Sequence, residues 1–263
     1  MSVSNYVSEV NGIFGRWIKK TLRRPQFLFF SLVQPVVWFV LFTAAFSKIA
    51  DIPGFGQAAG TTSYVAFFSA AVIIQTVISS AMQSGIGMVT DLESGYMDKM
   101  RVAPIHRSAI LLGKVLSDGF RIVIQTVVIL LLGLLLGVTI ATGILGLVLL
   151  LAIVLTFGIA WSGISTFIGL ATKNSEATLM ISILTTFPLL FLSTAVMPKF
   201  LLQDWVQTVA TYNPMSYIAD GLHGLIITGF DWTTLGYAAL TILVVGAVSL
   251  TATTSMFRRR VSG

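Results

Sequence analysis

The sequence predicts an all-α integral membrane protein with six transmembrane helices, and two observations lead to this fold class. Of the 263 residues, 56% are hydrophobic and only 10% are charged, and the mean hydropathy is +0.92. An ordinary soluble domain carries charge on roughly a quarter of its residues, because water must wet its surface. The charged residues are also separated by long uncharged intervals, each long enough for the ~20 apolar residues that cross a bilayer. The composition therefore excludes a soluble enzyme, a disordered chain and a nucleic-acid-binding protein.

The uncharged intervals define the expected spans. A segment inside a bilayer must satisfy its backbone hydrogen bonds internally, and the alternating pattern of β-barrel strands does not occur, so the spans are expected to be helices. The expected spans are 26–47, 62–88, 109–138, 144–171, 177–197 and 233–256. Together they predict a single transmembrane domain over residues 1–263.

The distribution of Lys and Arg predicts the orientation. If the N-terminus is cytoplasmic, 14 of the 16 Lys and Arg residues fall on the cytoplasmic side, and only Lys48 and Lys199 fall outside. Positively charged loops stay on the cytoplasmic side of a membrane. This split therefore predicts a multi-pass plasma-membrane protein with both termini in the cytoplasm. The net charge of +6 then reports orientation and requires no nucleic-acid partner.

Residues 1–24 precede the first span and predict an amphipathic helix. They lack the order of a signal peptide, in which a short charged cluster comes before the apolar run. Apolar residues recur at helical spacing, with basic residues beside them. We expect an interface helix on the cytoplasmic membrane surface that includes Phe14, Lys19 and Lys20 and places Trp17 near the lipid headgroups. The alternative is a soluble helix packed on a partner.

The connection 89–108 after the second expected span is too long and too polar for a simple turn. Tyr96, Met97 and Met100 form a short apolar face beside charged residues, and Pro104 ends the short helix. Met and Tyr on such a helix suit a groove of a soluble partner. The alternative is a solvated connector.

The segment 198–231 is the longest one expected on the outer side. Asn213 followed by Pro214 is a strong signal for the start of a helix. The helical pieces that contain Tyr217 and Asp220 are too short and too polar to span. They are expected to be re-entrant or interfacial half-helices, with Asp220 at a rim wetted by water.

Several chemistries find no support in the sequence. No ionisable residue lies near the middle of an expected span, which argues against an ion-coupled transporter. A phosphate-binding loop, a zinc-binding helix and cysteines are absent from the sequence, so neither ATP nor a metal is expected on this chain. Gly163-Ile164-Ser165 has the loose pattern of an intramembrane serine protease, but neither histidine lies in an expected span to serve as a base. An intramembrane serine hydrolase is kept as an alternative function.

Three stretches carry a resemblance to a known family, in the same order and over nearly the whole chain. They are Arg23-Arg24-Pro25 with Gln34-Pro35-Val-Val-Trp38, then Asp91-Leu-Glu93-Ser-Gly95 with Lys99-Met-Arg101-Val-Ala-Pro104, and last Tyr212-Asn213-Pro214-Met-Ser-Tyr217. The chain resembles the membrane permease subunit of a type-2 ATP-binding cassette (ABC) transporter. It looks most similar to the daunorubicin-resistance and multidrug exporter branch.

The resemblance implies a role for three parts of the chain. The amphipathic helix would be the family's interface helix, a coupling helix would dock on a separate ATPase subunit, and outer re-entrant helices would close the exit. The implied coupling residues are Glu93, Gly95, Tyr96, Met97, Asp98, Lys99, Met100, Arg101 and Pro104. The implied residues of the outer gate are Asn213, Pro214, Tyr217 and Asp220.

The resemblance also implies an assembly of two permease copies, expected to be a homodimer, with two ATPase subunits that bind ATP and Mg. The chain itself would then need no cofactor and would not be an enzyme. We expect ATP-driven export of a drug-like, lipid or other amphipathic substrate, because Phe, Leu, Met and Thr would line an apolar path. The alternatives are export of a polysaccharide or glycolipid, the serine hydrolase, and a passive membrane scaffold.

Overall fold

The computed structural model describes residues 3–23, 25–96 and 106–262, and every regular element in these ranges is helical. The long helices are α1 (Val3–Leu22), α2 (Pro25–Phe46), α4 (Tyr64–Glu93), α6 (Arg107–Leu135), α7 (Gly143–Thr172), α8 (Ser175–Phe191) and α11 (Trp232–Ser262). The shorter elements are α3 (Phe55–Ala59), α9 (Asp204–Tyr212), α10 (Pro214–His223), the 3₁₀ turns Ser47–Asp51 and Lys199–Leu201, and the π-helix Gly224–Thr228. The predicted all-α class is confirmed.

Within the described ranges, five helices are long and apolar enough to cross a membrane. They are Ser31–Asp51, Tyr64–Glu93, Ser108–Leu135, Gly143–Thr172 and Trp232–Phe257. The expected span 177–197 corresponds to α8, which is apolar but has only 17 residues. At 1.5 Å per residue α8 is about 25 Å long, so the count of six spans stays a prediction.

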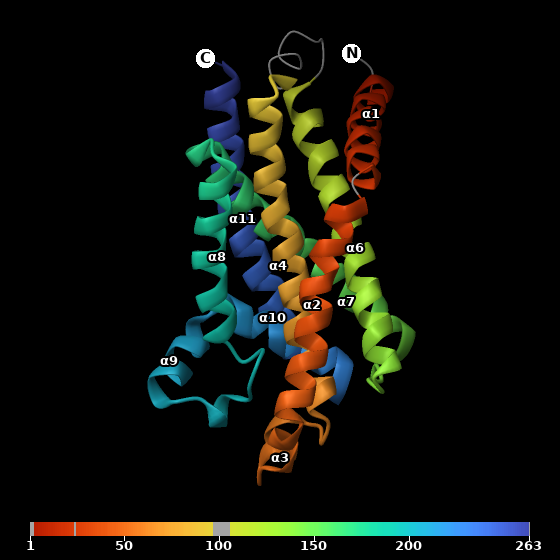
Figure 1. Cartoon of the computed structure of the whole chain (residues 1–263), viewed down its shortest axis with the longest axis vertical. Helices are drawn as coiled ribbons and strands as arrows, with labels where there is room; N and C mark the ends of the chain where they lie inside the picture. The colour runs from red at the N-terminus through yellow and green to blue at the C-terminus, as the bar shows by residue number, and fades with distance from the viewer. Residues whose placement is uncertain (1–2, 24, 97–105, 263) are drawn as a thin grey trace.

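Figure 1 shows an elongated bundle in which α1 begins and α11 ends at the same end. We call this the terminal end, and the opposite end, which carries α3 and α9, the distal end. Helix α4 lies at the centre of the bundle and packs against α2, α6, α7 and α8. Within the most apolar 18-residue stretch of α4, 78% of the residues are buried. Helix α4 therefore connects the two ends through the interior of the protein.

Glycines bring α4 and α7 unusually close together. A Cβ atom on Gly85 of α4 would overlap the backbone carbonyl of Ser165 on α7. A Cβ atom on Gly169 of α7 would lie 2.7 Å from the carbonyl oxygen of Gly85. Small residues allow the backbones of two membrane helices to approach in this way. This contact fixes α7 against the central helix.

Aromatic rings fill the space between α2, α4 and α8. The Trp38 and Phe42 rings of α2 stack with centroids 4.6 Å apart, and the Phe42 ring stacks on Phe68 of α4 at 5.3 Å. Phe187 and Phe191 of α8 approach the Trp38 ring at 5.9 Å. Offset and edge contacts of this kind stabilise a core beyond simple burial of area. The aromatic cluster holds these three helices around the hollow described below.

Candidate functional site

Helix α1 packs along α6 at the terminal end. Val10 and Ile13 of its apolar face are buried, and a Cβ atom on Gly113 of α6 would lie 2.8 Å from Ile13. The Phe14 ring makes an edge contact with Phe120 of α6, with 6.2 Å between the centroids. The predicted amphipathic helix is therefore present.

The environment of Trp17 differs from the prediction. Trp17 was expected near the lipid headgroups, but it is only 8% exposed and lies over Gly87 of α4. The Nζ atom of Lys114 lies 4.9 Å from the centre of the Trp17 ring. Helical periodicity shows which face of a helix is apolar, but not whether lipid or protein covers that face.

Asp91 joins α1 to the end of α4. Its carboxylate accepts hydrogen bonds from Lys20 Nζ at 2.7 Å and from Arg16 Nη1 at 3.3 Å. The Arg16 guanidinium also lies 3.2 Å from the centre of the Tyr96 ring, a cation–π contact. One cluster thus contains Lys20 of the expected interface helix and Tyr96 of the expected coupling segment.

A second contact joins α1 to the start of α6. The Glu9 carboxylate accepts a hydrogen bond from the backbone N–H of His106 at 2.9 Å and also contacts its Nδ1 atom at 2.9 Å. The backbone N–H of His106 holds the pKa of Glu9 below its ordinary value. Tyr96 and His106 lie on either side of segment 97–105, so α1 holds the chain on both sides of that segment.

The expected coupling residues are only partly described. Glu93 is the exposed last residue of α4, and Gly95 has a φ of +63°, a left-handed conformation that favours glycine. The remaining residues, Met97, Asp98, Lys99, Met100, Arg101 and Pro104, lie outside the described residues. Their coupling role stays a prediction.

Replacing Asp91 with asparagine should weaken the attachment of α1. The variant removes the charge that two cations share, and a hydrogen bond to a charged group contributes about 1.5–3 kcal/mol. We expect the free energy of unfolding in detergent to fall by about 1–3 kcal/mol. Glu93→Gln is the matched control, because Glu93 is exposed on the same helix end. Equal stability of the two variants would show that the cluster does not hold α1.

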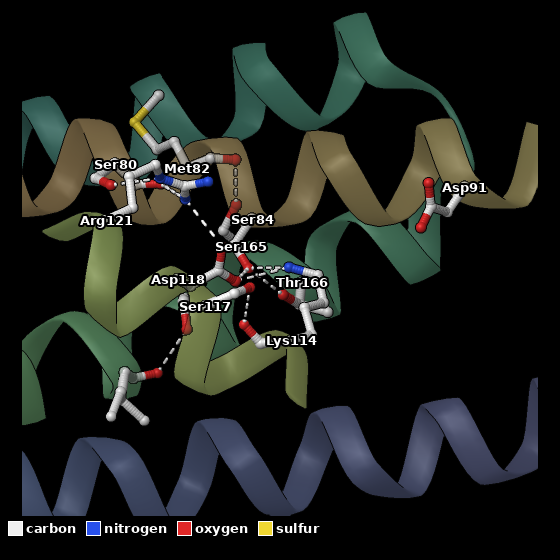
Figure 2. A network of polar contacts seen from close by, with 12 residues as sticks. Ser80, Met82, Ser84, Asp91, Lys114, Ser117, Asp118, Arg121, Ser165 and Thr166 are labelled. Carbon is white, nitrogen blue, oxygen red and sulfur yellow. Dashed lines mark hydrogen bonds and ion pairs between the residues drawn. The ribbon is translucent and has the colours of Figure 1, made fainter. Parts of the chain in front are cut away.

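A buried network of polar groups lies further inside the bundle (Figure 2). Lys114 and Asp118 of α6 form an ion pair at 2.7 Å, and Arg121 lies 3.0 Å from the other Asp118 oxygen. Ser84 of α4 donates to Asp118 and accepts from Lys114. Thr166 of α7 lies 3.3 Å from the Ser84 hydroxyl, so the network joins α4, α6 and α7.

Arg121 extends the network along α4. Its guanidinium donates to the Ser80 hydroxyl at 3.0 Å and to the Ser80 carbonyl at 2.8 Å. The three charged residues of α6 are spaced i, i+4 and i+7, which places them on one helix face. Lys114 and Asp118 lie in the first half of the expected span 109–138, but Arg121 lies near its middle, so the expectation that no ionisable residue lies near the middle of a span is wrong for this helix. Sequence reasoning missed the network, although this spacing was a usable signal.

A hollow of about 380 Å³ lies between α2, α4 and α8. Its polar lining consists of Ser31, Gln34, Gln75, Ser79, Gln83 and Thr186. Its apolar lining consists of Ile78, Met82, Ile86, Leu179, Ile183 and Phe187. Among the described residues, no ionisable side chain lines this hollow. Pockets of this kind, apolar with a few polar groups, are typical of small-molecule sites.

Gln75 is the informative polar residue of the hollow. It is 7% exposed, and its Oε1 atom has no hydrogen-bond partner among the described residues. Buried polar atoms are nearly always paired, so this unpaired acceptor marks an unmet polar requirement at the wall of the hollow. The three glutamines in otherwise apolar helices were a sequence signal that we missed, since we expected an apolar path lined by Phe, Leu, Met and Thr.

The distal segment positions the expected gate residues. Asn213 caps α10 by accepting from the Met215 N–H at 2.9 Å, and Pro214 occupies the first turn, which confirms the predicted helix start. The Asn213 amide also donates to two carbonyls at the end of α8. The Tyr217 hydroxyl donates to the Thr211 carbonyl at 2.7 Å.

Asp220 is half-buried and accepts a hydrogen bond from the Thr194 hydroxyl at 2.8 Å, so a protein group meets the carboxylate that was expected to face water. Helix α10 packs against α4, α8 and α11. The re-entrant and gate roles of this segment stay predictions.

Ser165 is engaged in helix packing. Its hydroxyl donates to the Met82 carbonyl at 2.9 Å, while Lys114 and Asp118 bond to Ser84 instead. A nucleophilic serine needs a base within hydrogen-bond reach, and the Ser165 hydroxyl instead bonds to a backbone carbonyl. The geometry does not support a serine hydrolase.

The fold and the hollow define a multi-pass membrane protein with a polar site among its apolar helices. A family model described as ABC-2 type transporter matches residues 9–227, and the chain belongs to this family. Members are membrane permease subunits that work with an ATPase partner, so this chain is not itself a catalytic enzyme.

Three relatives show the range of similarity. A daunorubicin resistance ABC transporter permease protein of Streptomyces coeruleorubidus is 29% identical over 72% of this chain and 64% of its own length. A putative transport permease of Pyropia yezoensis is 30% identical over 82% of this chain and 72% of its own length. A probable doxorubicin resistance ABC transporter permease protein of Mycobacterium tuberculosis is 20% identical over 86% and 78% of the two chains. The match thus spans about two thirds of the Streptomyces protein.

Proposed function

We propose that this chain is the membrane-spanning subunit of an ATP-driven exporter and that its substrate is an amphipathic, ring-containing compound. The observation that carries the proposal is the hollow between α2, α4 and α8. Amide groups there offer donors and acceptors, and the Phe187 ring at its wall offers an aromatic surface. Two relatives are named for resistance to daunorubicin and doxorubicin, which are amphipathic compounds with fused rings.

The proposed topology has six crossings and both termini in the cytoplasm of a plasma-membrane protein. A chain whose two ends lie on the same side of a membrane must cross it an even number of times. Both ends lie at the terminal end of the bundle (Figure 1), and the five long spans become six when α8 is included. The 14 Lys and Arg residues assigned to this side support its cytoplasmic location.

The proposed coupling contact is the segment from Glu93 to Pro104, which docks on an ATPase subunit that binds ATP and Mg. Helix α4 carries Asp91 near one end and Gln75 in its interior. The 16 residues between them correspond to about 24 Å of one continuous helix. A push on the terminal end of α4 therefore moves the wall of the hollow directly. The proposed complex has two permease copies as a homodimer and two ATPase subunits, and the mass of the purified complex tests this composition.

Replacing Gln75 with leucine should weaken substrate binding without harming the fold. The variant removes a buried acceptor that has no described partner, so we expect stability at least equal to that of the unchanged chain. Loss of one hydrogen bond to the substrate should weaken apparent affinity about three- to tenfold. The measurement is the doxorubicin concentration that half-maximally stimulates ATP hydrolysis by the reconstituted complex.

Gln57→Leu is the matched control, because Gln57 is exposed on α3 outside the hollow. Unchanged affinity in Gln75→Leu, or equal loss in both variants, would show that the hollow does not bind the drug.

Replacing Tyr96 with alanine should uncouple ATP hydrolysis from transport. The variant removes the ring on which Arg16 lies and so loosens the start of the coupling segment. We expect the complex to assemble normally. The number of drug molecules transported per ATP hydrolysed should fall about fivefold. This change corresponds to roughly 1 kcal/mol, the size of a partly exposed cation–π contact. Tyr212→Ala at an exposed site in α9 serves as the control. The same transport per ATP in both variants would contradict the coupling role of this segment.

A further inference from the structure

An open basic recess lies along one face of α1, separate from the hollow between α2, α4 and α8, and we call it the basic hollow. It is lined by Asn11, Gly12, Gly15, Arg16, Lys19, Lys20 and Arg23. Four of these residues are cations, and among the described residues their carboxylate partner is Asp91, which pairs with Arg16 and Lys20. Lys19 and Arg23 are exposed and form no ion pair with a described residue. The hollow therefore has an excess of positive charge that the described protein does not neutralise.

The floor of the basic hollow is open backbone. A Cβ atom on Gly12 or Gly15 would meet nothing within 4 Å, so no side chain of the described residues fills this space. A ligand can approach the α1 backbone closely here, with the Asn11 amide and the cations around it. Glycine in a helix interior costs about 1 kcal/mol relative to alanine, which makes two glycines at this face a notable feature.

Two exposed apolar side chains lie close in sequence to the same cations. Leu22 is 64% exposed and Phe29 is 65% exposed, one on each side of Arg23 in the chain. Helix α2 begins two residues after Arg23 and continues into the first candidate span. The basic hollow thus lies where the chain enters the bilayer, at the level of lipid headgroups. An acidic protein partner would be complementary to the cations but would leave Leu22 and Phe29 uncovered.

We infer that the basic hollow binds the phosphate headgroup of an anionic phospholipid whose acyl chains lie against Leu22 and Phe29. The cations provide attraction for the phosphate, and the bare glycine backbone provides room for the headgroup. The neighbouring apolar side chains favour a lipid over a small soluble anion. This inference does not depend on the identity of the exported substrate.

The test compares two lipids with identical acyl chains on the full-length chain in mild detergent. Native mass spectrometry measures bound phosphatidylglycerol against bound phosphatidylcholine. We expect phosphatidylglycerol to be preferred, and Lys19→Gln and Arg23→Gln each to lower that preference about fivefold. Gly15→Gln keeps every charge but places a side chain in the basic hollow. It should therefore also lower the preference for phosphatidylglycerol. Lys173→Asn removes an exposed cation elsewhere and should leave the preference unchanged.

Any one of the following outcomes would overturn the inference. The preference for phosphatidylglycerol could survive in the Lys19→Gln/Arg23→Gln double variant, or it could fall equally in Lys173→Asn. Either result would show only general attraction between charges. Full displacement of the lipid by millimolar inorganic phosphate would indicate a small-anion site. Displacement by the ATPase subunit or by poly-glutamate would indicate that the basic hollow is a protein-docking surface.

Discussion

Asp118→Asn is expected to lower the free energy of unfolding by about 3–5 kcal/mol. The carboxylate side chain is 3% exposed and faces Lys114, which is 4% exposed, and Arg121. Asparagine preserves the shape of the residue but leaves two cations without a neutralising charge in the interior. Removing one partner of a buried ion pair lowers the stability by far more than the intact pair contributes to it. The reason is that the remaining charge stays buried without water or a partner.

The measurement is reversible unfolding in mixed micelles, with the double variant Lys114→Met/Asp118→Leu as the comparison. The double variant removes both members of the closest pair and should lose less stability than Asp118→Asn. Arg121 keeps its hydrogen bonds to Ser80 in both variants. If Asp118→Asn is as stable as the unchanged chain, the network does not hold α4, α6 and α7 together.

Gly85→Ala is expected to cost about 2–4 kcal/mol and to reduce transport, because the new methyl group overlaps the Ser165 carbonyl of α7. Backbone atoms cannot move aside as a flexible side chain does, so the two helices must separate. Separation also pulls Thr166 away from Ser84 in the buried network. Better helix propensity of alanine, about 1 kcal/mol, offsets only part of this cost.

Gly87→Ala is the matched control on the same helix. A Cβ atom there would lie 3.5 Å from the Trp17 ring, an ordinary van der Waals distance. We expect this variant to be unchanged or more stable by up to about 1 kcal/mol. Equal thermal stability of the two alanine variants would contradict the close α4–α7 contact.

The positions of the spanning helices could be predicted from the sequence because hydrophobicity in a bilayer is a local property. The expected span 144–171 corresponds to α7, Gly143–Thr172. The expected span 62–88 corresponds to α4, which continues to Glu93, and the next two residues turn at Gly95. The extension past the apolar run is stabilised by Asp91, whose partners lie on α1. Contacts between distant segments therefore set this helix end.

The candidate site could be predicted only in part. The spacing of Asn213 and Pro214 indicated the start of α10 because capping is local chemistry. The burial of Trp17 and the ion pairs of Asp118 depend on how helices pack, and no local pattern reports that. The hollow around Gln75 requires three helices that are distant in sequence to meet. A glutamine in an apolar span indicates that its amide needs a polar partner. The packing of the helices decides whether that partner is a protein group or a bound molecule.

We propose that this chain and an ATPase subunit together move an amphipathic drug across a membrane. The most direct measurement is uptake of doxorubicin into inside-out proteoliposomes that contain both proteins, with the unchanged chain and Gln75→Leu compared. We predict uptake that requires ATP and both subunits and that needs more drug in Gln75→Leu for half-maximal rate. Uptake without ATP, uptake by either protein alone, or no uptake by the complete complex would contradict the claim.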